Sequence, residues 1–178
     1  MYIHLSAAVK GPGRDVAPRR FGVYTCMMTQ PRSAPGAPPA LPCACASLRR
    51  ASRAVTQLYE EALRPSGIRI TQFTLLQFLA LAGRPMTQGM LGQLLALDST
   101  TLSRTLKPLE SAGWIRSVAG PDGRERHVEL AAGGRRVLKR ATPAWEAVQQ
   151  RLRHALGPKQ WSALDELLTS LTRRSREL

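Results

Sequence analysis

Apolar residues between positions 87 and 111 recur at the spacing of two short amphipathic helices. Four of them share one side of a helix over about residues 87–95, and we expect that side to be buried: Met90, Leu91, Leu94 and Leu95. Asp98 or Ser99 can cap a second helix, because their side-chain oxygens accept hydrogen bonds from free N–H groups. In that helix Leu102, Leu106 and Leu109 point inward at intervals of four and three. Pro108 predicts a kink, or the end of this helix.

A short β-hairpin should follow the second helix. Gly113 is suited to end the helix, and residues 119–123 (AGPDG) have the composition of a turn. Ile115 and Val118 on one side, with Val128 and Leu130 on the other, indicate the two strands. A helix-turn-helix followed by such a hairpin is a winged helix, with the hairpin as its wing.

Longer helices should flank this winged helix. Residues 48–64 have the apolar period of an amphipathic helix, and residues 70–81 are apolar almost all round, as expected of a central buried helix. Residues 133–156 carry an apolar stripe with spacings of three and four, and Pro143 within them predicts a bend. Gly157 and Pro158 should end that helix, and a last helix begins at Lys159.

The outward face of the second short helix has an unusual composition. It carries only hydroxyls and cations, with no acid before Glu110: Thr100, Thr101, Ser103, Arg104 and Lys107. A solvated helix face usually mixes both signs of charge. Hydroxyls and arginines can bind phosphates and base edges, so this face is suited to a polyanion.

The net charge of +14 agrees with an anionic partner. The first 40 residues hold five cations and one acid, so most of the excess lies in the remaining chain. A genome of high GC content, which favours arginine, would explain part of it. No run of 18 apolar residues is present, and residues 1–9 lack the features of a signal peptide. We therefore expect a cytoplasmic protein that does not bind membranes.

The central segment resembles the MarR family of bacterial transcription regulators. The matching pieces are LGQLL (91–95), STTLSR (99–104), LESAGWI (109–115), and the Asp122-Gly123-Arg124 wing that leads into Val128-Glu129-Leu130. The chain departs from the family at Gly123, where an arginine is common, and at Ala131, where a threonine is common. The resemblance covers about residues 45–174. It implies a mainly α fold with a small β wing, and a homodimer whose terminal helices interlock.

Composition and apolar patterning, together with the resemblance, divide the chain into four parts. Residues 1–42, rich in Gly, Pro and Arg, are expected to be disordered, whether as a basic DNA-binding arm, an extension without function or a start assigned too early. Residues 43–67 would form the first dimerisation helix, residues 68–130 the winged helix-turn-helix, and residues 131–178 the C-terminal dimerisation helices. The apolar stripes of the terminal helices also favour dimerisation, because the small winged helix-turn-helix cannot cover so much apolar surface.

A dimeric regulator of this family would bind an inverted repeat in double-stranded DNA, with half-sites about 10 bp apart. The expected groove contacts are Thr100, Thr101, Ser103 and Arg104, with Lys107 on a phosphate and Arg124 and Arg126 in the wing. The alternative role of Arg104 and Arg124 is a surface salt bridge, with Asp122 a candidate partner in the wing. A repressor is the expected regulator, by analogy with the family.

Two inputs could release such a repressor. Cys43 and Cys45 precede the first helix near two arginines, which suits a thiol switch, and the family makes oxidant sensing conceivable. The other input is a small aromatic or phenolic effector in a pocket lined by Tyr59, Phe73 and Trp145, although such side chains are more often plain core. Cys26 lies in the N-terminal extension and is expected to be inert.

Other kinds of site are not indicated. His4, His127 and His154 lie far apart in the sequence without a metal-ligand spacing, so we expect no metal site. We expect no enzyme and no cofactor, because no phosphate loop, nucleophile–histidine pattern or paired acids occur. The alternative function is a non-specific basic architectural or RNA-binding module, which would have no need of long dimerisation stripes.

Overall fold

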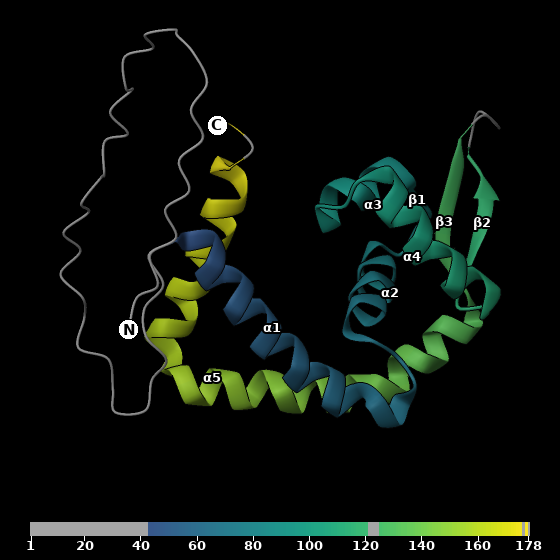
Figure 1. Ribbon diagram of the computed structural model, residues 1–178. Coiled ribbons are helices and arrows are strands. Elements are labelled where there is room, and N and C mark those ends of the chain that lie inside the picture. The colour runs from purple at the N-terminus through teal and green to yellow at the C-terminus, as the bar shows by residue number, and fades with distance from the viewer. Residues whose placement is uncertain (1–42, 121–124, 176, 178) are drawn as a thin grey trace, which may run out of the picture. The chain divides into compact units, whose positions relative to one another are not determined.

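The computed structural model describes residues 43–120, 125–175 and 177. The expected disordered extension and the tip of the wing lie outside these residues. The described chain begins with α1 (Ala44–Leu63), a short 3-10 helix η1 (Arg64–Ser66) and α2 (Ile70–Ala82). β1 (Met86–Thr87), α3 (Gln88–Leu95) and α4 (Ser99–Ser111) follow. β2 (Ile115–Ala119), β3 (Arg126–Leu130) and the long α5 (Ala132–Arg174) complete the fold, which is mainly helical as predicted (Figure 1).

The centre of the core is α2, which packs against both α1 and α5. Its Phe73, Leu75 and Leu76 are fully buried, as the apolar composition of this helix predicts. The expectation that apolar side chains point inward all round the helix is wrong at Leu81, which is 77% exposed because α2 ends one residue later. The start of α2 is joined to α1 by a hydrogen bond of 3.0 Å from the Ile70 N–H to the Glu60 carboxylate.

The helix-turn-helix is formed by α3 and α4. On α3 the expected buried face is much narrower than predicted, since only Leu91 is fully buried, while Met90 and Leu94 are 38% and 48% exposed. Gly92 lies close to the turn that follows α3, since a Cβ there would lie 3.0 Å from the Leu97 carbonyl oxygen and 3.8 Å from the Leu102 side chain of α4.

The three inward leucines of α4 are confirmed. Leu102, Leu106 and Leu109 are all buried, with exposures of 1%, 5% and 0%. The helix does not end at Pro108 but runs on to Ser111. Burial of Leu109 one residue later holds the last turn against the core, which offsets the hydrogen bond that the proline cannot donate.

The sheet has three antiparallel strands in the order β1-β3-β2. The expected hairpin is present, with Ile115 opposite Leu130 and Ala119 opposite Arg126. The short strand β1 was not expected from the sequence; it pairs Met86 with Val128 on the other edge of β3. It joins the start of α3 to the wing, so the helix-turn-helix and the hairpin share one sheet.

The long helix α5 starts against the base of the wing and is interrupted once. A Cβ at Gly134 would lie 2.1 Å from the Trp114 carbonyl oxygen, so only glycine permits this approach. Further on, Gly157 has non-helical dihedral angles (φ 73°, ψ 163°), which confirms the predicted break. No non-helical angle occurs at Pro143. Figure 1 shows the first part of α5 running beneath α1 and α2.

Candidate nucleic-acid interface

The outward face of α4 presents unoccupied hydrogen-bond donors. Thr100, Ser103, Arg104 and Lys107 are exposed. Within the described residues neither Arg104 nor Lys107 forms a salt bridge, in contrast to Arg116, which pairs with Glu129 in the sheet. The buried leucines on the other side of α4 fix the direction in which these four side chains point. The face therefore offers cationic and hydroxyl groups to a ligand without first breaking internal bonds.

The start of α4 is capped by Asp98. One carboxylate oxygen accepts a hydrogen bond of 2.9 Å from the Thr101 N–H, and the other accepts one of 2.6 Å from the Thr101 hydroxyl. The hydroxyl bond and then the backbone bond hold the pKa of this exposed carboxyl below its usual value. The Asp98 carboxylate and the Thr101 hydroxyl thus stabilise the first turn of the helix that carries the candidate site.

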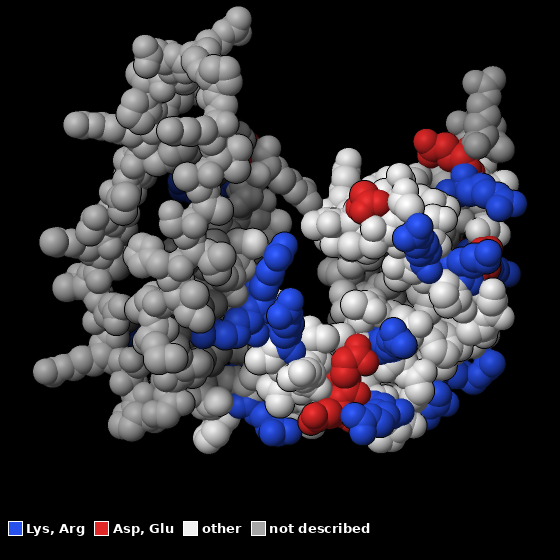
Figure 2. All heavy atoms as spheres, viewed as in Figure 1, with Lys and Arg blue, Asp and Glu red and all other residues white. Residues whose placement is uncertain are grey.

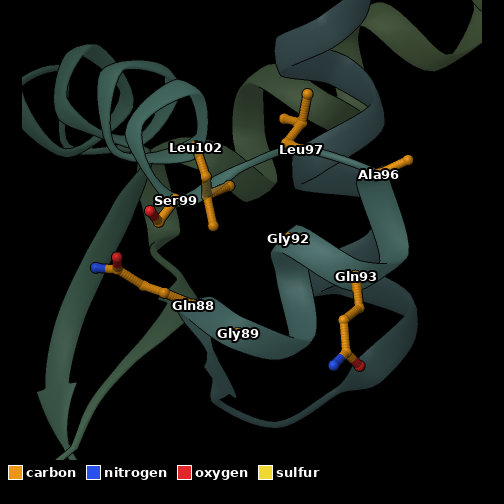
Figure 3. A pocket seen from close by; sticks show the side chains of 8 residues that line it. All are labelled: Gln88, Gly89, Gly92, Gln93, Ala96, Leu97, Ser99 and Leu102. Carbon is orange, nitrogen blue, oxygen red and sulfur yellow. The ribbon is translucent and has the colours of Figure 1, made fainter.

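A shallow depression separates α3 from α4 (Figure 3). The side chains of Gln88 and Ser99 lie toward one end of it, and Gln93 lies toward the other. Leu102 and the glycines of α3 form its apolar part. The Thr87 hydroxyl accepts a hydrogen bond of 3.1 Å from the Met90 N–H and so caps α3 at this edge.

The base of the wing carries one of the two expected arginines. Arg126, the first residue of β3, is exposed, while Arg124 and its candidate partner Asp122 lie outside the described residues. The next residue, His127, lies 3.7 Å from the Glu125 carboxylate. The imidazole also packs against Gly120, where an added Cβ would come within 2.9 Å of Nε2. Of the two expected wing arginines, the structure therefore places one.

Cationic side chains are prominent on the face seen in Figure 2. They gather over α1, the β2–β3 hairpin and the first part of α5, and acidic side chains interrupt them at a few points. The expected basic character of the folded part is thus visible on its surface. Such a surface attracts a polyanion at long range and adds little sequence preference by itself.

Comparison with known proteins agrees with this geometry. The model of the MarR family matches residues 66–125, from the end of η1 to the residue before β3. A crystal structure of the M. tuberculosis transcriptional regulator MosR in complex with DNA is 35% identical, covers 76% of this chain and 97% of its own, and superposes with a TM-score of 0.69. The chain belongs to the MarR family. Members and structural neighbours are transcription regulators and not enzymes.

Two further relatives support membership of the MarR family. A cysteine-to-serine mutant of MarR from E. coli, complexed with operator DNA, is 25% identical, covers 71% of this chain and 91% of its own, and has a TM-score of 0.65. The HTH-type transcriptional regulator YwoH of Bacillus subtilis (strain 168) is 34% identical over 83 residues. That match spans 47% of this chain and 60% of the length of the curated relative.

Of the three aromatic residues expected to line an effector pocket, two line a groove and the third is buried behind it. Tyr59 of α1 and Trp145 of α5 line an open groove, whereas Phe73 is fully buried behind it and stacks on Trp145. Burial raises the pKa of the Tyr59 phenol, although the charge of Arg153 acts against this shift.

Sequence reasoning missed one polar member of this groove. The Oε1 atom of Gln149 is buried and has no hydrogen-bond partner among the described residues. It lines the same groove as Thr56, Thr74 and Gln77. The signal was present in the sequence, because Gln149 lies four residues after Trp145 and so on the same face of the helix.

The two cysteines lie where the sequence suggested, at the start of α1. Cys43 is its N-cap residue and Cys45 lies in its first turn; both thiols are free and exposed. Arg49 and Arg53 line a shallow groove with them. Within the described residues no cluster of three metal-binding side chains occurs, and no described helix is long and apolar enough to cross a membrane.

Proposed function

We propose that this protein is a homodimeric, sequence-specific DNA-binding transcription regulator. The observation that carries the proposal is the outward face of α4, where exposed hydroxyls and cations without internal partners stand on a helix anchored by buried leucines. The MosR and MarR structures, each a complex with DNA, support it. Thr100, Thr101, Ser103 and Arg104 contact base edges in the major groove, and Lys107 binds a phosphate.

The wing supplies a second contact on each half-site. Arg126 projects from the start of β3, and Arg124 precedes it by two residues along the chain. Because β1 joins this hairpin to the start of α3, the wing and α4 approach DNA as one unit. In this proposal α4 enters the major groove while the wing arginines reach the flanking backbone or minor groove.

A second copy of the chain covers the exposed apolar side of the terminal helices. Beyond Gly157, four leucines of α5 are between 40% and 68% exposed: Leu164, Leu167, Leu168 and Leu171. On α1, Leu48 and Val55 are each 38% exposed. So much apolar surface on two helices is typical of an interface. A two-fold dimer would place two α4 helices on an inverted repeat with half-sites about 10 bp apart.

The groove between α1, α2 and α5 is the proposed site for a small aromatic or phenolic effector. Trp145 offers a ring face, and the unpaired Oε1 of Gln149 offers an acceptor for a phenol or N–H donor. Phe73 lies behind Trp145 and would transmit a change in the ring to α2. Gln149→Leu should weaken effector release of DNA while leaving DNA binding without effector unchanged.

Thiol oxidation at Cys43 and Cys45 is the alternative input to the same regulator. Both thiols are free and exposed, and Arg49 and Arg53 line a shallow groove with them, so an oxidant could reach either sulfur. The variant with both Cys43→Ser and Cys45→Ser should bind DNA like reduced wild type and no longer respond to peroxide. Release of this variant by peroxide would exclude the switch. Binding without an input, and release with one, is the behaviour of a repressor.

The regulator is tested by fluorescence anisotropy with the full chain and duplexes tiled across the region upstream of its gene. At near-physiological salt a specific regulator should prefer one tile over a scrambled duplex by about a thousandfold or more. Equal, weak binding to every tile, lost as salt rises, would lead to a selection of bound fragments from the whole genome. If that selection also yielded no preferred sequence, the protein would be a non-specific basic module.

A further inference from the structure

The hydroxyl of Thr101 is already used inside α4. A threonine hydroxyl has one hydrogen to donate, and here it donates that hydrogen to the Asp98 carboxylate over 2.6 Å. The bond is short and its acceptor is charged, which makes it stronger than a bond between neutral groups. The same carboxylate also accepts from the Thr101 N–H, so the side chain is held in one orientation.

The other hydroxyls of α4 differ in whether they are free to donate a hydrogen bond to a ligand. Thr105 donates to the Thr101 carbonyl over 2.9 Å and is half-buried, so it is also occupied. Thr100 and Ser103 are exposed and make no such bond within the described residues. Of the four hydroxyl side chains between positions 100 and 105, two can donate to a ligand and two cannot.

The orientation of Thr101 decides what it can offer to DNA. Its hydroxyl is held by the Asp98 carboxylate and the residue is exposed, so the methyl group is the part of the side chain that no internal bond occupies. A phosphate oxygen needs a donor and would be repelled by the nearby carboxylate, which makes a backbone contact unfavourable. On the base edges of the major groove, the partner for a methyl group is the C5-methyl of thymine.

We propose that Thr101 recognises a thymine through its methyl group and that Asp98 is the positioning residue that keeps the hydroxyl out of the groove. This inference rests on the proposed function and assigns a specificity to one position of the same site. It distinguishes Thr101 from Thr100 and Ser103, which contact DNA as donors. The first turn of α4 would thus read one apolar group beside hydrogen-bonding groups.

The test is a double-mutant cycle that removes the methyl group of Thr101, the methyl group of one thymine, or both. The probe is the tightest duplex that the full chain selects from a randomised pool, with each thymine replaced in turn by deoxyuridine, which lacks only the methyl. For wild type, one replacement in each half-site should weaken binding about fourfold, the effect of a single buried methyl. Thr101→Ser, which lacks the methyl, should bind the thymine and uridine duplexes equally.

Thr101→Val is the matched variant, because it keeps the methyl and the β-branched shape while removing the hydroxyl. It should bind the selected duplex within about twofold of wild type. It should also keep the uridine effect, which is the ratio of the affinity for the thymine duplex to that for the deoxyuridine duplex. Asp98→Asn still caps the helix but frees the Thr101 hydroxyl, and should reduce the uridine effect. Because this effect is a ratio of two affinities, the loss of one negative charge, which strengthens binding to every duplex, cancels. Thermal melting checks that all variants fold.

Each remaining outcome has one meaning. A loss of tenfold or more in Thr101→Val would show that the hydroxyl contacts DNA and would overturn the inference. A uridine effect that persists in Thr101→Ser, or its absence at every thymine in wild type, would do the same. If wild type selects no duplex over a scrambled one, the proposed function itself fails, and the inference fails with it.

Discussion

The rings of Phe73 and Trp145 stack with their centroids 5.6 Å apart and their planes at 26°. Phe73 belongs to α2 in the middle of the core, and Trp145 belongs to α5 and is only partly buried. The pair therefore joins the body that carries α3 and α4 to the long C-terminal helix. A ligand in the groove beside Trp145 would touch Phe73 only through that ring.

Phe73→Ala should lower the free energy of unfolding by about 3–5 kcal/mol, because it removes a fully buried ring and leaves a cavity. Urea denaturation at a fixed protein concentration measures the change. Phe78→Ala is the matched control, since Phe78 lies on the same helix but is only half-buried. Equal losses from the two substitutions would mean that the Phe73–Trp145 stack has no special part in stability.

The contact between Gly134 and the Trp114 carbonyl predicts a position where alanine is not tolerated. An added Cβ would lie 2.1 Å from that backbone oxygen, so the start of α5 would have to move away from the wing. We expect Gly134→Ala to cost at least about 2 kcal/mol. Gly89→Ala, where the nearest atom would be 3.7 Å away, should be neutral or slightly stabilising in the same thermal melts.

The Asp98 cap makes stability depend on pH in a predictable direction. Its pKa is lowered in the folded state, chiefly by the Thr101 hydroxyl bond, so its contribution is present above the unfolded pKa and is lost as pH falls through the folded pKa. Melting temperatures of wild type and Asp98→Asn should therefore differ at neutral pH and converge in acid. Asp165→Asn, an exposed position of α5, controls for the change in net charge. A difference that widens in acid would contradict this assignment.

Local pattern was enough to predict the helices and the hairpin of this chain. The leucines of α4, the hydrophobic α2 and the break at Gly157 all depend on the residues of one element and its neighbours in sequence. The short strand β1 could not be predicted in this way, because two residues become a strand only by pairing with β3, about 40 residues later. The same holds for Met90 and Leu94, whose exposure depends on which other elements pack against α3.

The candidate site was predictable in its residue types and less so in its details. An outward face of hydroxyls and cations follows from helical spacing, and the structure places it there. That Thr101 is bonded to Asp98 while Thr100 is not depends on side-chain rotamers, which spacing does not determine. For the aromatic groove, the sequence predicted that Phe73 and Trp145 lie close together, and they do touch. It could not predict that this contact buries Phe73 and leaves Trp145 to line the groove.

Arg104 and Lys107 should have different roles on DNA, and substitution can separate them. If Arg104 contacts a base, Arg104→Ala should weaken binding to the preferred duplex by about tenfold to a hundredfold and relax its sequence preference. Lys107→Ala should weaken binding to all duplexes alike and reduce the salt dependence, as expected for a phosphate contact. Arg151→Ala, an exposed arginine of α5, controls for charge, and anisotropy at several salt concentrations measures all three. If the three variants behaved identically, the α4 face would have no part in recognising the DNA sequence.

The exposed leucines beyond Gly157 predict a dimer that one substitution can break. Leu164, Leu168 and Leu171 share a face of α5 and are each about 40% exposed, so the isolated chain leaves them in water. Leu164→Asp should shift the protein from dimer to monomer in light scattering while leaving its helical content unchanged, because the leucine is not part of the core. Thr169→Asp adds the same charge on another face of the helix and should remain dimeric.

The monomer should also bind an inverted repeat no more tightly than a single half-site, because the second α4 is no longer held in register with the first. If Leu164→Asp stayed dimeric, the interface would have to lie elsewhere on the chain. If it became monomeric and still bound the repeat with wild-type affinity, dimerisation would have no part in recognition.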